Sequence, residues 1–280
     1  TLPNGDLIAG GWFTTAGGVT VNNIARWNGS TWSALGTGRN GIVHALTTLP
    51  NGDLIAGGEF TTAGGVPTNR IARWNGSEWS ALGTGMDNTV YALTTLPNGD
   101  LIVGGFFFTA GGVPANNIAR WNGSDWSSLG SGVIGAVLSL TTLPNGDLVA
   151  GGLINTAGGV PANRIARWNG STWSAFGSGP NEGVLACTAL PSGDLIAGGG
   201  FTTAGGVVAP HIARWGCPPP PPCPADFDGD GFVDFFDLDA FAACFEGDPC
   251  PPGKSADFDG DGFIDFFDFS AFVAAFETGC

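Results

Sequence analysis

The sequence predicts an all-β fold, a propeller of about five four-stranded blades, followed by a small α-helical domain. A 47-residue motif recurs along the first three quarters of the chain, glycine contributes 49 of the 280 residues, and only 12% of the residues are charged. This composition disfavours long helices over most of the chain. The 43% of hydrophobic residues, with 20 Phe and 10 Trp, are sufficient for a packed core and exclude general disorder.

The repeat is clearest in the segment Thr-Leu-Pro-Asn-Gly-Asp-Leu. It begins at Thr1, Thr48, Thr95 and Thr142, and in altered form at Ala189, so the period is 48 − 1 = 47 residues. Each unit holds four short apolar segments, and Asn-Gly pairs such as Asn51-Gly52 favour two-residue turns between antiparallel strands. The longer connection at residues 61–69 contains Pro67 and is expected to break strand pairing. Four antiparallel strands per unit are typical of a propeller blade.

The strands expected at the two ends of the array do not match in number. The second-strand and third-strand motifs occur five times each, whereas the inner-strand and outer-strand motifs occur four times each. The first unit therefore lacks an inner strand and the last lacks an outer strand. Exposed sheet edges invite pairing with another chain, so head-to-tail association into a fibre or tube is one prediction. Closure of the ring by a segment upstream of Thr1 is the alternative.

The repeated pattern resembles bacterial secreted propeller repeats of the delta-60 or Rax2-like type, which are distantly similar to kelch repeats. The resemblance covers about three quarters of the chain and rests on five occurrences of the motif. It implies the propeller fold and no particular activity.

Repeated polar and aromatic residues in the array have structural explanations. An Asp begins each second strand and an Arg lies near the end of each third strand, so antiparallel pairing predicts a cross-strand ion pair, as for Asp53 with Arg73 and Asp100 with Arg120. Tryptophans flank the following hairpin turn, and packing between blades is expected of them in preference to stacking on sugars. The Asn-Gly-Ser sequons coincide with turns, which favours a turn role over glycosylation.

The expected inner strands carry no Asp or Glu, although catalysis by a propeller glycosidase requires carboxylates that converge near the axis. His44 occurs in one unit alone, where the other units have Tyr91, Leu138 and Leu185. We therefore expect no enzymatic activity.

Composition divides the chain into residues 1–216, a Pro-rich linker at 217–224, and a domain at 225–280. The first part holds ten acids and eight bases, and residues 217–280 hold fourteen acids and Lys254 alone, which gives balances of −2 and −13. Neither part has the basic patch that nucleic acid or an anionic membrane surface requires. No apolar run approaches the length of a membrane span, so membrane insertion is not expected.

Two near-identical acidic loops in the last domain predict two calcium sites. Oxygen ligands fall at positions 1, 3, 5, 9 and 12, with Gly at position 6 and a main-chain carbonyl at position 7, as in EF-hand loops. The predicted ligands of the first ion are Asp226, Asp228, Asp230, the carbonyl of Phe232, Asp234 and Asp237. Those of the second ion are Asp257, Asp259, Asp261, the carbonyl of Phe263, Asp265 and Asp268.

Aspartate at position 12 and a single helix after each loop resemble the duplicated repeat of type I dockerins, and closely the dockerin-like tails of secreted planctomycete proteins. The resemblance covers residues 224–280 and implies a calcium-stabilised docking module. It departs from cellulosomal dockerins in the 31-residue separation of the loops, 257 − 226, and in Phe235-Phe236 and Phe266-Phe267 at the positions that usually contact cohesin.

Five of the six cysteines lie at residue 217 or later, which suggests an oxidising extracellular setting. With two His and no Cys-x-x-Cys motif, a zinc site is not expected. The pairing suggested by position is Cys223 with Cys280 and Cys244 with Cys250, which leaves Cys187 with Cys217.

The function favoured by these features is that of a secreted or cell-surface structural protein, a propeller scaffold with a calcium-stabilised docking module. Its expected partners are copies of itself or another extracellular protein. The alternative is a propeller that binds polysaccharide through its loops and aromatic residues, with the tail as its attachment.

Overall fold

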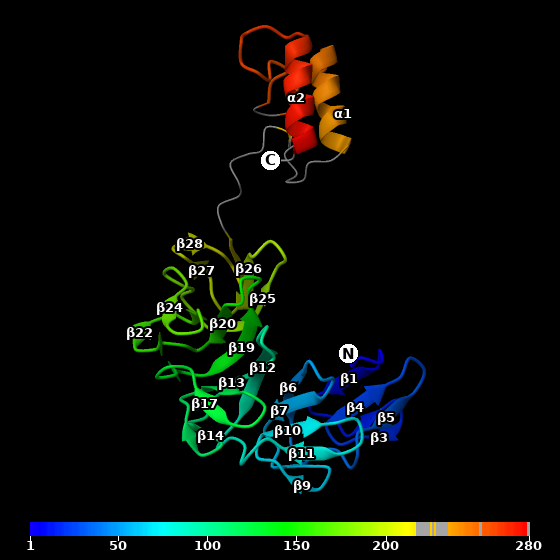
Figure 1. Cartoon of the computed structure of the whole chain (residues 1–280), viewed down its shortest axis with the longest axis vertical. Helices are drawn as coiled ribbons and strands as arrows, with labels where there is room; N and C mark the ends of the chain where they lie inside the picture. The colour runs from blue at the N-terminus through cyan, green and yellow to red at the C-terminus, as the bar shows by residue number, and fades with distance from the viewer. Residues whose placement is uncertain (217–224, 226, 228–234, 252–253, 279–280) are drawn as a thin grey trace. The chain divides into compact units, whose positions relative to one another are not determined.

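The computed structural model describes residues 1–216, 225, 227, 235–251 and 254–278. The chain forms two compact units, Thr1–Trp215 and Gly216–Cys280, which are described separately (Figure 1). No helix within the described ranges has the length and apolarity needed to cross a membrane.

The first unit is an array of five antiparallel sheets, one for each repeat. Inner strands are β6 (Val43–Thr48), β12 (Val90–Thr95), β19 (Val137–Thr142) and β25 (Val184–Ala189). Second strands are β1 (Leu7–Gly10), β7 (Leu54–Gly58), β13 (Leu101–Gly105), β20 (Leu148–Gly152) and β26 (Leu195–Gly199). Third strands are β4 (Ile24–Trp27), β10 (Ile71–Trp74), β16 (Ile118–Trp121), β23 (Ile165–Trp168) and β29 (Ile212–Trp215). Outer strands are β5 (Trp32–Ala34), β11 (Trp79–Ala81), β17 (Trp126–Ser128) and β24 (Trp173–Ala175).

Three of these sheets have four strands, and the first and last have three, β1-β4-β5 and β25-β26-β29. The sheets follow one another in chain order, and each inner strand contacts the next, from β6 to β25 (Figure 1). The four-stranded sheets and the repeat confirm the predicted all-β propeller architecture. The strand counts at the two ends also match the sequence prediction.

Glycine allows close approach between neighbouring sheets. A Cβ built on Gly57 at the end of β7 would lie 2.3 Å from Val90 Cγ1 of the next inner strand, so no larger side chain fits there. Gly10, Gly104 and Gly151 meet the corresponding valines at 2.5–2.7 Å. Each sheet therefore packs its second strand against the apolar side chains of the following inner strand.

The tryptophans join adjacent repeats, as predicted. Trp79 Nε1 donates a hydrogen bond to the Leu35 carbonyl at 3.0 Å, and the same bond joins Trp126 to Leu82 and Trp173 to Leu129. Trp79 is only 5% exposed and lies against Trp74 with ring centroids 5.1 Å apart. In the second, third and fourth repeats, the second tryptophan of the pair therefore packs between blades and is not available as an open stacking surface.

The connection after each second strand differs from the prediction, because it pairs with itself. Thr62 lies opposite Pro67 in a small hairpin, and both Gly64 (φ 58°) and Gly65 (φ 82°) adopt the positive φ angles of its turn. The proline does not interrupt pairing because this hairpin is only two residues long and Pro67 is at its edge. The hairpins are β2 (Thr15–Ala16) with β3 (Val19–Thr20), β8 (Thr62–Ala63) with β9 (Val66–Pro67), β14 (Thr109–Ala110) with β15 (Val113–Pro114), β21 (Thr156–Ala157) with β22 (Val160–Pro161), and β27 (Thr203–Ala204) with β28 (Val207–Val208).

The hairpins of the second to fifth repeats also receive a bridge from the preceding repeat. The strand β18 (Val133–Ile134) pairs with β21, and isolated bridges join Arg39 to Ala63, Met86 to Ala110 and Pro180 to Ala204. Residues 61–69 and their counterparts therefore help to hold consecutive blades together.

The second unit contains the helices α1 (Phe235–Glu246) and α2 (Phe266–Thr278). Phe241 and Phe272 stack at its centre, with ring centroids 4.1 Å apart and planes 3° from parallel. Phe227 meets Phe241 and Phe258 meets Phe272 edge to face. Because 258 − 227 and 272 − 241 both equal 31, the two loop-helix repeats contribute equivalent rings to this core. The predicted small helical domain is confirmed.

Candidate metal centre

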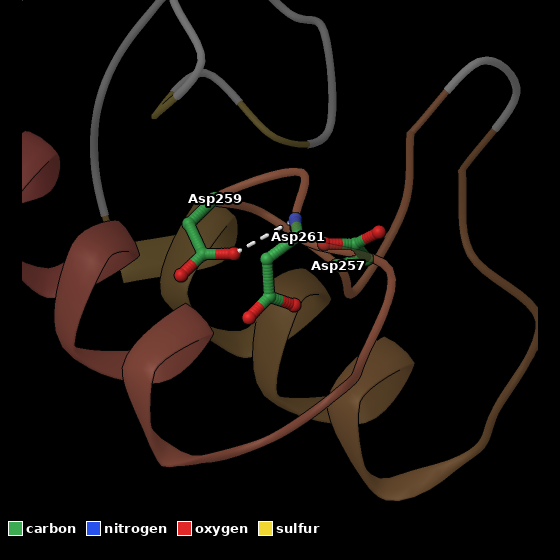
Figure 2. A group of neighbouring side chains, drawn as sticks. All are labelled: Asp257, Asp259 and Asp261. Atoms are coloured by element: carbon green, nitrogen blue, oxygen red, sulfur yellow. Dashed lines mark hydrogen bonds between the residues drawn. The ribbon is translucent and has the colours of Figure 1, made fainter.

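Three carboxylates of the second acidic loop converge in the structure. Asp257, Asp259 and Asp261 each offer an oxygen, and these oxygens lie within 4.8 Å of one another (Figure 2). The loop is held by short-range bonds, since Asp259 Oδ1 accepts the Asp261 N–H at 3.1 Å and Asp261 Oδ1 accepts the Phe263 N–H at 2.9 Å. Positions 1, 3 and 5 of the predicted site are thus brought together by the local fold of the loop.

One oxygen of this cluster is buried without a partner. Asp257 Oδ2 accepts the Gly262 N–H at 3.1 Å, whereas Asp257 Oδ1 is shielded from solvent and has no hydrogen-bond donor. An unsatisfied buried carboxylate oxygen is unfavourable, and a hard cation such as Ca²⁺ prefers oxygen ligands of this kind. The donor set therefore fits calcium.

The electrostatics of the cluster also favour a bound cation. The N–H of Asp261 lowers the pKa of Asp259, but burial and repulsion from the carboxylates of Asp261, Asp268 and Asp257 outweigh it, so the pKa is raised overall. A bound cation would relieve this repulsion.

Asp265 and Asp268, at positions 9 and 12 of the loop, form hydrogen bonds at the start of α2. Asp265 Oδ1 accepts the Phe267 N–H at 2.8 Å, and Asp268 Oδ2 accepts the Asp265 N–H at 2.8 Å, which is a capping box. Asp268 Oδ1 also accepts the N–H groups of Phe258 and Asp259. These bonds, led by that from Asp265, lower the pKa of Asp268. The two residues thus carry a structural role that the ligand spacing alone did not reveal.

The first loop is described only in part. Asp226, Asp228, Asp230, Phe232 and Asp234 lie outside the described residues. Asp237 is 1% exposed, and its Oδ1 accepts the Phe227 N–H at 2.6 Å, the bond equivalent to that between Asp268 and Phe258. In both repeats, therefore, the aspartate at position 12 ties the loop to the first turn of the helix.

The cysteines of the second unit include one disulfide among the described residues. Cys244 and Cys250 are bonded, with their Cα atoms 4.7 Å apart, as expected from their separation of six residues. Cys217, Cys223 and Cys280 lie outside the described residues.

Cys187 is a free thiol, so its predicted pairing with Cys217 is wrong. It occupies the inner-strand position that is Leu46, Leu93 or Leu140 in other repeats, and its Sγ lies 3.2 Å from the Ser139 hydroxyl of the neighbouring inner strand. Cys187 therefore packs between blades. Burial raises its thiol pKa to about 11, although the Ser139 bond acts in the opposite direction.

The Asp and Arg that recur in every repeat form the cross-strand ion pair. Arg73 Nε lies 2.6 Å from Asp53 Oδ2, and Arg120 Nε lies 2.7 Å from Asp100 Oδ2. The same carboxylate oxygen of Asp53 also accepts the Asn51 amide at 2.7 Å. This aspartate joins the turn before the second strand to the third strand, which is a structural role.

Two contacts were not foreseen from the sequence. His44 Nε2 lies 3.1 Å from Glu59 Oε1, and the His44 and Tyr91 rings are 5.2 Å apart. Each inner strand has a bulge beside its first residue, as between Val43 and Ala45, which places His44 in the irregular position. His44 and Glu59 are non-repeating residues, and the pairing of Val43 with Gly58 places both at the same end of the sheet.

Comparison with known proteins gives a family-level result for the array. The family model described as a domain of unknown function (DUF5122) beta-propeller matches residues 2–30, 49–76 and 96–127. These segments contain the turns, second strands and third strands of the first three repeats. No curated protein sequence matches the chain.

Solved structures of propellers are similar to the chain at low sequence identity. The extracellular domain of the putative one component system BT4673 from B. thetaiotaomicron is 11% identical, with a TM-score of 0.47, over 70% of this chain and 25% of that one. Virginiamycin B lyase from Staphylococcus aureus is 18% identical, with a TM-score of 0.45, over 79% and 73%. A gluconolactonase from Xanthomonas campestris is 15% identical, with a TM-score of 0.44, over 68% of each chain. The chain thus spans a quarter of the length of the first of these. The first unit is a β-propeller repeat array.

Proposed function

We propose that the second unit binds Ca²⁺ in the loop before α2, and a second Ca²⁺ in the equivalent loop before α1. The observation that carries this proposal is the convergence of Asp257, Asp259 and Asp261 around the unpartnered Oδ1 of Asp257. The carboxylates would hold the ion, and the main-chain carbonyl of Phe263 would complete the set expected from the loop. The ion would offset part of the negative charge of this acidic unit.

Calcium binding and folding are expected to be linked. The loop that gathers the carboxylates leads directly into α2, and the Phe core depends on both helices remaining in place. Without a cation, repulsion among the carboxylates opposes this arrangement, so binding free energy becomes folding free energy.

We further propose that the array is a non-catalytic scaffold of a secreted or cell-surface protein. Half of its ten acidic residues are bound to the repeated arginines. Among the described residues, the one group of three candidate metal ligands is in the second unit. The proposed role is therefore to present surfaces on a rigid frame.

Copies of the protein are the proposed partners of this frame. Leu7 of the first sheet is 45% exposed where Leu54 is 3% exposed, and Ile212 of the last sheet is 64% exposed where Ile71 is fully buried. The end sheets thus expose apolar residues that are covered in the middle of the array. Such faces favour association, and light scattering that shows a strictly monomeric protein at high concentration with calcium would contradict this part of the proposal.

The calcium proposal is tested by far-ultraviolet circular dichroism. Both helices of the described chain belong to the second unit, so the helical signal reports on that unit alone. We expect EGTA to remove this signal and Ca²⁺ to restore it, with Mg²⁺ much less effective because it demands a tighter octahedral set. An unchanged helical signal in EGTA would contradict the proposal. Isothermal titration should count two ions per chain.

A further inference from the structure

We propose that a polar cavity between the fourth and fifth repeats of the array binds a carboxylated sugar unit, such as a uronic acid. The cavity has a volume of about 550 Å³, within the range of small-molecule sites. It is lined by Asn155, Asn163, Arg164, Ser178, Gly179, Pro180, Asn181, Thr203 and Gly206. This inference goes beyond the calcium function and does not depend on it.

The residue at the position of Arg164 varies among the repeats, with Arg70 in the second and His211 in the fifth. In the first and third repeats this position is Asn23 or Asn117, whose amide donates to the carbonyl of Arg39 or Val133 at 3.1 and 2.8 Å. These bonds hold the turn after the outer strand. The Arg164 side chain does not have the short amide that forms this hydrogen bond. In the fourth repeat a guanidinium therefore takes the place of a structural amide, and it bonds to Asn155.

Backbone conformation makes this replacement costly. The residue at this position has a positive φ in every repeat, 68° for Asn23 and Asn117 and 73° for Arg164. Asparagine tolerates this region because its side chain bonds locally, whereas other non-glycine residues are disfavoured there. Arg70 has the same backbone conformation, with a φ of 71°, so the cavity and not the backbone distinguishes Arg164.

The cavity offers donors suited to a carboxylate. Arg164 Nη1 donates to Asn155 Oδ1 at 2.8 Å, which fixes the side chain at the cavity wall. A guanidinium has five N–H donors, so this bond leaves others to form the paired bonds that carboxylates accept from Arg. Within the part of the chain that the structure describes, Arg164 is the single charged residue that lines the cavity, so its charge determines the sign of the ligand.

The rest of the lining suits hydroxyl groups. Asn163 Nδ2 donates to the Ser178 carbonyl at 2.9 Å, and Asn181 Oδ1 accepts the N–H groups of Thr202 and Thr203. The amides are thus fixed in orientation, and the Ser178 and Thr203 hydroxyls can both donate and accept. None of the described residues that line the cavity is aromatic, which disfavours a neutral sugar held by ring stacking.

Binding of trigalacturonate is the proposed test, measured by calorimetry on the whole chain in EGTA. Chelation prevents calcium from bridging sugar carboxylates. It also separates this site from the calcium unit, because binding should persist when the second unit has lost its metal. Two control ligands separate the contributions of the sugar and the carboxylate. Galactotriose is a neutral trisaccharide without carboxylates, and acetate is a carboxylate without a sugar.

The two arginine variants introduce a residue that other repeats hold at the same position. Arg164→Asn introduces the residue of the first and third repeats and should weaken trigalacturonate binding at least tenfold. Arg70→Asn makes the same change at the equivalent position of the second repeat, where Arg70 contacts the Glu59 carbonyl, and should leave binding unchanged. Asn155→Asp places a carboxylate in the cavity wall and should also abolish binding.

The outcomes are distinct. The proposal is supported if trigalacturonate binds, galactotriose and acetate do not, and Arg164→Asn alone of the two arginine variants loses binding. It is overturned if galactotriose binds equally well, if Arg164→Asn binds like the parent chain, or if Arg70→Asn loses as much affinity. Absence of trigalacturonate binding by the parent chain also overturns it.

Discussion

The guanidinium of Arg39 lies over the ring of Trp79, with Cζ 3.6 Å from the ring centroid. Phe60 packs on it as well, at 4.6 Å. Arg39 is 3% exposed, and its three side-chain nitrogens are buried without hydrogen-bond partners. The equivalent residues of the next two repeats are the buried Met86 and Val133.

Replacement of this buried charge should stabilise the array. Arg39→Met introduces the residue that the second repeat already holds, and we expect a gain of about 1–3 kcal/mol because no unpaired cation remains buried. Urea unfolding followed by tryptophan fluorescence measures the change. Met86→Leu is the matched control and should change stability by less than about 1.5 kcal/mol. A loss of stability in Arg39→Met would show that the contacts with the two rings outweigh desolvation.

The two members of the repeated ion pair should differ in their importance. Asp100 is 7% exposed and accepts bonds from both Arg120 and Asn98, whereas the Arg120 side chain is 45% exposed. Arg120→Ala should cost about 0.2–1 kcal/mol, and Asp100→Ala about 1–3 kcal/mol because it removes two hydrogen bonds to a charged group at once. Thermal unfolding measures the stability of the two variants. Equal losses of stability would show that the bond from Asn98 to Asp100 contributes nothing.

Acid should weaken the last blade through Asp194. The hydrogen bond from Arg214, followed by that from Ser192, holds the pKa of Asp194 below its ordinary value of 3.8. The folded state therefore binds this proton less readily than the unfolded state, so the stabilisation is present above pH 3.8 and is lost as the pH falls below it. Arg214→Gln should flatten the decline in stability over this range, as measured by acid titration of tryptophan fluorescence.

The carboxylate of Asp259 should destabilise the calcium loop when no metal is bound and stabilise it when calcium is bound. Because the pKa of Asp259 is raised, its ionisation destabilises the folded loop when no cation is bound. Asp259→Asn should therefore increase the helicity of the metal-free unit and reduce calcium binding by one ion. Asp239→Asn, an exposed change on α1, is the control and should alter neither property. Calorimetry and circular dichroism separate the two effects.

Protons should compete with calcium at this loop. Asp259 takes up a proton at a higher pH than an ordinary aspartate, whereas Asp268 stays ionised. Calcium affinity should consequently fall as the pH approaches the carboxylate range from above, and binding there should release protons. Calorimetry in two buffers of different ionisation enthalpy would detect this release. Affinity independent of pH down to the ordinary aspartate pKa would contradict the prediction.

Cys187 should be unreactive in the folded protein. Its thiol pKa of about 11 leaves little thiolate at neutral pH, and the side chain is packed against the neighbouring inner strand. Iodoacetamide at pH 8 should leave this residue unmodified until denaturant is added, as checked by mass spectrometry of the peptide that contains it. Rapid labelling of the native chain would contradict its packed position.

Much of the architecture follows from the sequence because its signals are local. The Asn51-Gly52 turn and the Asp53 that follows it involve neighbours along the chain, and their recurrence every 47 residues sets the number of blades. The capping residue Asp265 and the carboxylates at positions 1, 3 and 5 of the calcium loop are likewise close in sequence. Antiparallel pairing of adjacent strands then placed Arg73 beside Asp53 without further information.

The tertiary structure decided features that depend on contacts between repeats. The sequence predicts a disulfide between Cys187 and a cysteine of the linker. In the structure Cys187 instead contacts Ser139 of the neighbouring inner strand, which is 48 residues earlier. The burial of Arg39 depends on Trp79 of the next repeat, and the polar cavity at Arg164 forms only where two repeats meet. Sequence periodicity specifies which strands and turns each blade contains. The surfaces between blades are created by packing, so they could not be predicted from any single repeat.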